Sequence, residues 1–324
     1  MAEPKPSFEQ LTEQLRQAQA VGDPWKEGIA LNNLGSYCKD QRDTSKAVEY
    51  FQKALEYFTA LADAEKKATV LSNLGGVYLD TQQPQKALES FAMALGNYGS
   101  IGQHFGQGMA LNNMGGVHFS LRRYEDARKQ FILSASFFRS AESPAWEGQA
   151  LENLAAAEAG LGNNRGAVES YGRALEIWQR QDQTDRQALI FNRIGAIYSS
   201  LGEHKRAVEL HTRALALSQS ASNVPLVAAT RASLGRAHFE SKQWDAAKPH
   251  FDEALRLFHQ VGDKKSYAVA LFHLGKLNLA AGQDMLRSAA TIFHELGDTA
   301  SEHAALDLLP AAPAIVDKPQ KKQA

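Results

Sequence analysis

The sequence predicts an all-α fold, an α-solenoid built from antiparallel helix pairs, and two observations predict it. The first is a repeat of forty residues, in which a glycine recurs at one position and Ala155 takes the only remaining place. These glycines are Gly35, Gly75, Gly115, Gly195, Gly235 and Gly275. The second is the spacing of small and apolar residues around each glycine, which follows the period of an α-helix. Repeats of this kind bury their core by stacking on one another.

Each repeat contains two helical stripes. In the first repeat, positions 28, 31, 35 and 38 share one helix face, and positions 47, 51, 54, 55 and 58 share another. Turn and N-cap residues, such as those at 43–45 and 162–164, lie between the stripes. Seven repeats are predicted, at about 24–63, 64–103, 104–143, 144–183, 184–223, 224–263 and a shortened 264–298.

The two ends of the array are predicted to be capped, because a terminal repeat has no neighbour to cover its outer face. Residues 1–23 form the amino-terminal cap, with a lone helix over 7–21. Residues 299–309 are predicted to form a closing helix. Residues 310–324, rich in Pro, Ala and Lys, are predicted to be a flexible tail.

When the repeats are aligned, equivalent positions form columns, and these columns resemble the tetratricopeptide repeat over nearly the whole chain. The second repeat reads Leu71-x2-Leu74-Gly75-x2-Tyr78, followed by Ala87-x3-Phe91 and then Ala94. The period of forty, leucine in place of the usual tryptophan, and the missing terminal proline resemble the long-period subclass. That subclass includes LGN/Pins-type scaffolds, kinesin light chains and bacterial regulators, and the fourth repeat matches it more weakly. The resemblance implies a right-handed superhelix with a concave groove.

Composition excludes several classes of protein. With 35 basic and 36 acidic residues, no overall field draws the chain to nucleic acid or to an anionic membrane. The single cysteine, Cys38, cannot form an internal disulfide, so the chain suits a reducing compartment and is expected to be cytoplasmic. The start lacks a secretory signal, and the late run LLPAAPAIV is too short to span a bilayer. Neither export nor membrane insertion is expected.

The sequence contains no catalytic or metal-binding signature, and neither HExxH, GxxxxGK[ST] nor GxSxG is present. The glycine-rich stretch at 160–166 coincides with a turn between two helices rather than following a strand, so it is not read as a phosphate loop. Cys38, His118 and His238 share the column of Tyr78 and Tyr198 and are read as packing residues. We therefore expect no enzyme activity, no cofactor and no metal.

The candidate site is the other face of the first helices, where asparagines recur. They are Asn32, Asn33, Asn73, Asn112, Asn113, Asn153 and Asn192. Small residues accompany them, and asparagine offers both the donor and the acceptor needed to grip a peptide bond. The resemblance agrees, because kinesin light chains hold extended peptides with comparable asparagines. The alternative is that these asparagines bond neighbouring helices or are simply solvated.

The same face becomes basic towards the carboxy terminus. It carries Arg193, Arg236, His273 and Lys276. This pattern predicts a second, acid-binding part of the groove. The alternative is scattered, solvated surface charge, because Glu152 and Glu240 interrupt the trend.

These observations predict a non-enzymatic scaffold or adaptor that binds an extended segment of a protein partner in the groove. Two alternatives are a regulatory or peptide-sensing subunit that controls a separate enzyme, and a structural scaffold that self-assembles through its outer helices. The carboxylate clamp for Hsp70 or Hsp90 tails is missing, because Asn32 is followed one turn later by Ser36 rather than by lysine. Binding of those tails is disfavoured.

Overall fold

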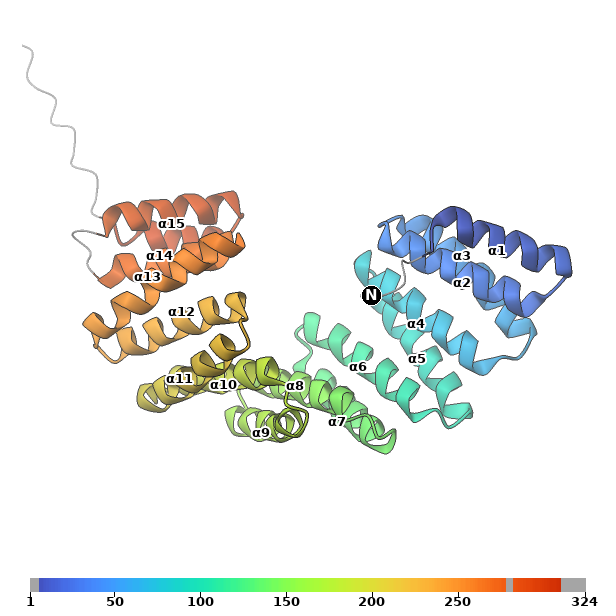
Figure 1. Ribbon diagram of the computed structural model, residues 1–324, viewed down its shortest axis with the longest axis horizontal. Coiled ribbons are helices and arrows are strands. Elements are labelled where there is room, and N and C mark those ends of the chain that lie inside the picture. The colour runs from blue at the N-terminus through green and yellow to red at the C-terminus, as the bar shows by residue number, and fades with distance from the viewer. Residues whose placement is uncertain (1–5, 278–281, 310–324) are drawn as a thin grey trace, which may run out of the picture. The chain divides into compact units, whose positions relative to one another are not determined.

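The computed structural model of the chain describes residues 6–277 and 282–309 (Figure 1). Within these ranges the chain forms 16 α-helices and no β-strand. The helices are α1 (Phe8–Val21), α2 (Pro24–Asp40), α3 (Thr44–Ala60), α4 (Ala64–Asp80), α5 (Pro84–Ser100), α6 (His104–Ser120), α7 (Tyr124–Ser140), α8 (Pro144–Gly160), α9 (Asn164–Arg180), α10 (Thr184–Ser200), α11 (His204–Ser220), α12 (Val224–Glu240), α13 (Trp244–Val261), α14 (Lys264–Leu277), α15 (Gln283–Glu295) and α16 (Thr299–Leu306).

The helices form two compact units. Unit 1 runs to Gln181 and contains α1 to α9, and unit 2 starts at Asp182 and contains α10 to α16. Within each unit every helix packs against the next one along the chain. The first helices of adjacent repeats also touch, as α2 touches α4 and α12 touches α14. Each unit is therefore a stack of helix pairs, and the predicted all-α solenoid is confirmed.

One turn, repeated along the chain, joins the helices. Arg42, Ala62 and Gln82 have positive φ values of 62°, 53° and 57° and follow one another at intervals of twenty residues. After the first two, the amide of Asp43 bonds to the carbonyl of Cys38 at 2.9 Å, and that of Asp63 bonds to Phe58 at 3.0 Å. These bonds satisfy carbonyls left free at the helix end. Asp43 and Asp63 then cap the next helix by accepting from a backbone N–H three residues on.

The recurring glycine allows the two helices of a repeat to cross closely. A Cβ atom on Gly35 would lie 2.7 Å from the ring of Phe51, and one on Gly75 would lie 2.5 Å from Phe91. Both distances are shorter than a van der Waals contact, so no larger residue fits without movement. The glycine therefore makes room for an aromatic ring of the second helix.

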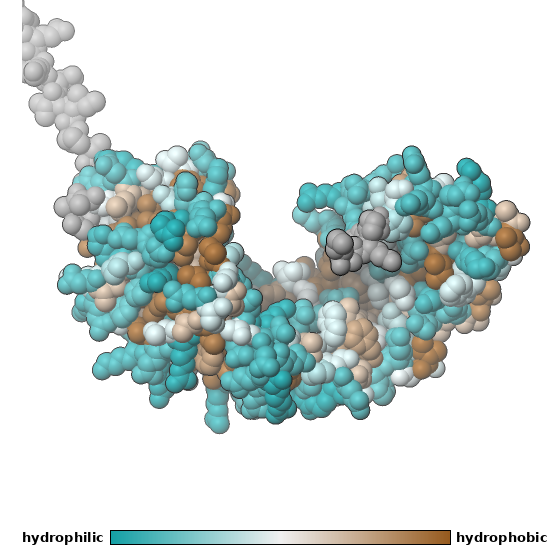
Figure 2. Space-filling view, in the orientation of Figure 1, coloured by the Kyte–Doolittle hydropathy of each residue, from teal (hydrophilic) through white to brown (hydrophobic). Residues whose placement is uncertain are grey.

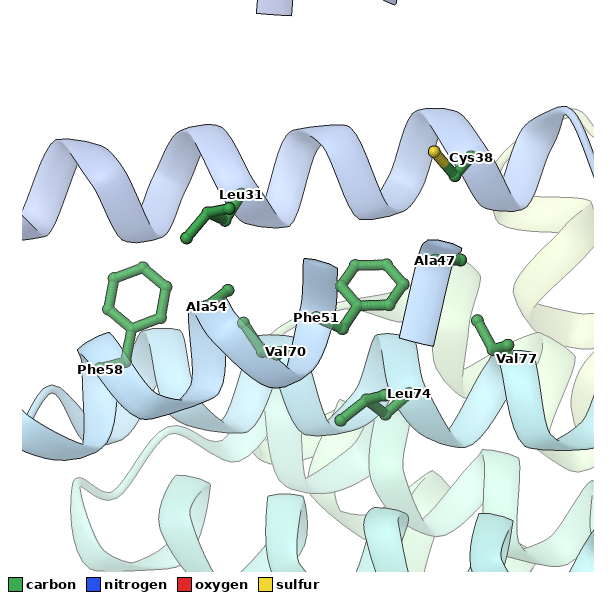
Figure 3. Close-up of a cluster of buried hydrophobic side chains, with 9 residues drawn as sticks. All are labelled: Leu31, Cys38, Ala47, Phe51, Ala54, Phe58, Val70, Leu74 and Val77. Atoms are coloured by element: carbon green, nitrogen blue, oxygen red, sulfur yellow. The ribbon is translucent and has the colours of Figure 1, made fainter. Parts of the chain in front are cut away.

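The aromatic ring also reaches the next repeat. In Figure 3, Leu31 of α2 lies above Phe51 and Phe58 of α3, and Leu74 of α4 lies below them. Phe51 and Phe58 have no exposed surface, and Leu74 is 4% exposed. One buried cluster thus joins three successive helices, so each repeat completes the core of its neighbour.

The fourth repeat is as regular as its neighbours, since α8 and α9 each have 17 residues. It does correct one expectation from the sequence, because Glu152 is not a surface charge. Its side chain is 6% exposed and accepts a hydrogen bond of 2.8 Å from Trp178 Nε1. Glu158, 8% exposed, accepts one of 2.9 Å from Ser170 Oγ. A donor from α9 thus compensates for burying each carboxylate of α8.

The ends of the array hold shorter helices. At the amino end, α1 has 14 residues and packs on α2, and at the carboxy end α15 has 13 and α16 has 8. The tail predicted at 310–324 lies outside the described residues. Figure 2 shows mainly hydrophilic side chains on the visible surface, with hydrophobic ones in smaller groups. Among the described helices, none is both long and apolar enough to cross a bilayer.

Candidate functional site

The asparagines predicted from the sequence lie on the first helices of unit 1, namely α2, α4, α6 and α8. Asn33 is exposed, and the side chains of the others in this unit are half-buried. They come from successive repeats and share one helix face, because each lies at the same position of its repeat or one residue before it. The site is thus built on rigid helices rather than on loops.

Four of these asparagines bond to one another between helices. Asn73 Nδ2 donates to Asn32 Oδ1 at 2.9 Å, and Asn153 Nδ2 donates to Asn112 Oδ1 at 3.0 Å. The partners in each pair are 41 residues apart, so each bond links the first helix of one repeat to that of the next. These side chains have a structural task whatever else they bind.

Asn113 is different because the corresponding acceptor is missing. The residue 41 positions before it is Ser72, whose buried Oγ has no hydrogen-bond partner within the described protein. No hydrogen bond from the Asn113 side chain is found in residues 6–277 and 282–309. Its amide therefore remains available, both as a donor and as an acceptor.

A pocket of about 230 Å³ opens beside Asn113. Its lining residues are Leu79, Asn112, Asn113, Gly116, Phe119, Phe131, Asn153 and Ala156. Gly116 leaves it open, because a Cβ atom there would meet nothing within 4 Å. Leu79 and Phe119 supply apolar walls and Asn113 a polar one, so the pocket suits a ligand that carries both kinds of group.

Sequence reasoning missed the apolar walls. Leu79 of α4 and Phe119 of α6 are forty residues apart and occupy one column, and Phe239 continues that column in α12. A search for large apolar residues at one position on the groove side would have found them. In other repeats the same column holds Lys39 and Ala159, which hides the apolar pattern in the sequence.

In unit 2, Asn192 serves the core. Its Oδ1 accepts a hydrogen bond of 2.6 Å from Nδ1 of His211, a fully buried residue of α11 that replaces the usual phenylalanine. Burial, and secondarily the charge of Arg236, lower the pKa of His211 to about 4. His211 is therefore neutral at pH 7, with its proton on the nitrogen that faces Asn192.

The basic members of the candidate set lie on three helices of unit 2. Arg193 of α10 and Arg236 of α12 are exposed. Lys276 of α14 lies with Nζ 5.3 Å from the ring centres of both Phe239 and Phe272. These contacts hold the ammonium group over two apolar rings.

His273 of α14 belongs to the same surroundings but turns towards the core. Its ring stacks on Phe251 with 5.7 Å between the centres and 3° between the planes. Burial first, and then the charges of Arg236 and Lys276, lower the pKa of His273 to about 4. It is a neutral side chain at pH 7, not one of the site's cations.

The arrangement offers hydrogen bonds and apolar contact. Within the described ranges, no three His, Cys, Asp or Glu residues are grouped so that they could hold a metal ion. The buried carboxylates of α8 already accept hydrogen bonds from α9.

The comparison with protein families identifies the class of protein. The model of the tetratricopeptide repeat matches residues 26–100, 66–140 and 146–220, and a second model of the same description matches residues 227–261. The chain therefore belongs to the tetratricopeptide repeat family, as the sequence columns predicted.

Solved structures show the same fold at low identity. Aspartyl phosphate phosphatase F from Bacillus subtilis is 20% identical, with a TM-score of 0.62, over 94% of this chain and 74% of that one. The apo form of the quorum sensor NprR from B. thuringiensis is 14% identical, with a TM-score of 0.60, over 93% and 97%. A Rap protein complexed with competence and sporulation factor is 17% identical, with a TM-score of 0.53, over 92% and 78%. The comparison with curated proteins gives no match.

Proposed function

We propose that this chain is a non-enzymatic protein-interaction scaffold that binds an extended segment of a partner polypeptide on the first-helix face of unit 1. One observation carries the proposal: the unpaired amide of Asn113 lies at the edge of an apolar pocket kept open by Gly116. An extended peptide presents an N–H, a C=O and a side chain at every residue, and this site offers a partner to each.

The paired and the unpaired asparagines have different roles in this proposal. Asn32, Asn73, Asn112 and Asn153 set the spacing of adjacent first helices and keep part of their hydrogen-bonding capacity. Asn33 and Asn113 are the members that we assign to the ligand backbone. In this proposal, peptide contacts alternate with structural contacts along the face.

The principal alternative is a peptide-sensing or regulatory subunit. It is supported by the similarity to a quorum sensor and to a Rap protein complexed with a factor, both of which stack helices in the same way. Both functions use the same site on unit 1. If the chain is a scaffold, peptide binding should leave the rate of a separate enzyme unchanged. If it is a regulatory subunit, peptide binding should alter that enzyme's rate.

Self-assembly is a second alternative, and the outer helices supply one observation in its favour. Met93 of α5 and Ile132 and Leu133 of α7 are exposed by 52%, 43% and 47%. Sedimentation velocity over a concentration series would reveal growth through this surface. We expect the chain to stay at one size, because three side chains offer far less than the roughly 800 Å² per partner of a stable interface.

The decisive experiment fills the pocket. Peptides are selected from a displayed library of random twelve-residue sequences, and their affinities are measured by fluorescence anisotropy. Gly116→Leu should weaken their binding about ten- to hundredfold, because the new side chain takes the place of a buried apolar group. The variant should fold, because Gly116 faces open space and leucine is the better helix former.

Gly96→Leu is the matched control. Gly96 is an exposed helical glycine of α5 with nothing within 4 Å of a Cβ atom, but it does not line the pocket. It should leave binding unchanged. Equal affinities for the wild type and both variants would rule out this pocket as the peptide site.

A further inference from the structure

One column of the first helices changes from small to basic residues within unit 2. In repeats one to five, the residue after the conserved glycine or alanine is small: Ser36, Gly76, Gly116, Ala156 and Ala196. In the next two repeats this place holds Arg236 and Lys276. The helices that carry them, α12 and α14, pack against each other. Two cations thus occupy a position that is small or open elsewhere.

Neither cation is neutralised. In the part of the chain that the structure describes, no carboxylate lies within ion-pair distance of Arg236 or Lys276. Glu240, the next acidic residue of α12, is exposed, lies one turn beyond Arg236 and forms no ion pair with it. Lys276 instead contacts Phe239 of α12 and Phe272 of α14, each at 5.3 Å. Aromatic rings hold the ammonium group in place and leave its charge uncompensated.

The field of these cations reaches the interior. Burial is the main cause of the low pKa of His273 and of His211; Arg236 and Lys276 lower that of His273 further, and Arg236 that of His211. Nδ1 of His273 is buried and has no hydrogen-bond partner within the described protein. His211 and His273 therefore add no charge here at pH 7, and the cations of this column are Arg236 and Lys276.

We propose that Arg236 and Lys276 form an anion-binding subsite on the first-helix face of unit 2, and that its ligand is an acidic, Asp- or Glu-rich segment of a polypeptide. Charge complementarity favours an anion. Two point charges one repeat apart match carboxylates spaced along an extended chain, and the phenyl rings offer apolar contact to their methylene groups. Nucleic acid is disfavoured because the whole chain carries a net charge of −1.

This proposal shares one assumption with the proposed function, namely that the ligand is a polypeptide. The subsite lies in unit 2, whereas the Gly116 pocket lies in unit 1. Gly116→Leu should therefore leave it intact, and the two proposals can fail independently.

The test uses the full chain and a fluorescein-labelled octaglutamate peptide, with octaserine as the neutral probe. Anisotropy should show saturable binding of octaglutamate that weakens as salt rises from 0.05 to 0.5 M, concentrations chosen to span a wide range of screening. Arg236→Ala with Lys276→Ala should weaken it about fivefold, at the scale of two exposed ion pairs. Arg236→Gln with Lys276→Met, which keeps the side-chain stems over the rings, should do the same.

Lys264→Ala with Lys265→Ala is the charge-matched control, because both are exposed residues of α14 outside this column. It should stay within twofold of the wild type. A second readout is the NMR titration of His273, whose pKa should rise when octaglutamate binds, because an anion offsets the two cations.

Three results would overturn the proposal. One is the absence of saturable octaglutamate binding to the wild type. Another is equal loss in the Lys264→Ala, Lys265→Ala control and in the variants of Arg236 and Lys276. The third is tighter binding of an eight-nucleotide oligothymidylate through the same two residues, which would make nucleic acid the ligand class.

Discussion

Unit 1 and unit 2 stack the same kind of helix pair but fill one core position differently. In unit 1 an aromatic ring, such as Phe51 or Phe91, occupies the space beside the recurring glycine. In unit 2 the first such position holds His211, whose ring lies against Gly195, and the next holds Phe251. His211 has no exposed surface, and its Nε2 has no partner within the described protein.

Other positions follow the same trend. Thr230 of α12 is fully buried where α4 has Val70, and Arg231 stands in the column of Leu71. Thr230 Oγ1 and Arg231 Nε are buried without a partner within the described protein. The comparison teaches that at these core positions the two units differ more in the polarity of the residue than in its size. The fold tolerates polar groups in unit 2 at the cost of stability.

The largest difference in stability between the two units should appear when the pH is lowered. The pKa values of His211 and His273 lie at about 4, below the ordinary value of 6.5, so the unfolded chain binds more protons between these limits. Unit 2 should keep this stability above about pH 6.5 and lose roughly 2 to 3 kcal/mol per histidine as the pH falls to 4.

Urea unfolding at a series of pH values, followed by hydrogen-exchange mass spectrometry, would report each unit. Unit 1 contains His104 and His118 but neither of these buried histidines. Equal losses in both units between pH 6.5 and 5 would contradict the comparison.

A deletion in the apolar core of unit 1 should have the next largest effect. Phe91→Ala removes a ring that is 1% exposed and packs against Gly75, and should lower the free energy of unfolding by about 3 to 5 kcal/mol. Chemical denaturation measures the loss. A loss below 1 kcal/mol would mean that the glycine–aromatic contact is not the main source of stability.

Restoring the aromatic ring in unit 2 should act in the opposite direction. His211→Phe removes a buried polar atom and a titrating group, although Asn192 loses its 2.6 Å partner. We expect a gain of about 1 kcal/mol at pH 7 and a larger gain at pH 5. If the gain does not grow as the pH falls, His211 is not a source of the acid sensitivity.

The smallest expected effects on stability concern the asparagines of unit 1, and they should distinguish the paired asparagines from the unpaired ones. Asn153→Ala breaks the bond to Asn112 and should lower stability by about 0.5 to 1.5 kcal/mol. Asn113→Ala breaks no hydrogen bond found in the described protein and should change stability by less than about 0.5 kcal/mol. It should nevertheless weaken peptide binding about two- to tenfold. Equal melting temperatures for the two variants would contradict the assignment of Asn153 to structure and Asn113 to ligand binding.

The fold could be predicted from the sequence because its cause is periodic. A glycine every forty residues, with an aromatic residue sixteen positions later, records where two helices cross and what fills the crossing. The columns of Gly35 and Phe51 carry this information without any knowledge of the coordinates. Helix length and turn position follow from the same period.

The site could be predicted only in outline. A column of asparagines is compatible with ligand binding and with bonds between helices, and only the coordinates show that Asn73 reaches Asn32 while Asn113 has Ser72 in place of a partner. The burial of Glu152 does not follow from its column, because it depends on Trp178, which lies 26 residues away. His273 shares a column with the asparagines, yet its larger ring turns onto Phe251.

The turns give the array a property that no single repeat has. Successive turn residues with positive φ, such as Arg42, Ala62 and Gln82, keep one interval of twenty residues. Duplication or excision of forty residues therefore joins a turn to an identical turn, and every later helix keeps its orientation. A one-residue deletion would instead rotate the following helix by about 100° and turn its core stripe towards solvent. The array can thus lengthen or shorten by whole repeats without disturbing its core stripes, whereas a change of one residue in the length of a turn disrupts them.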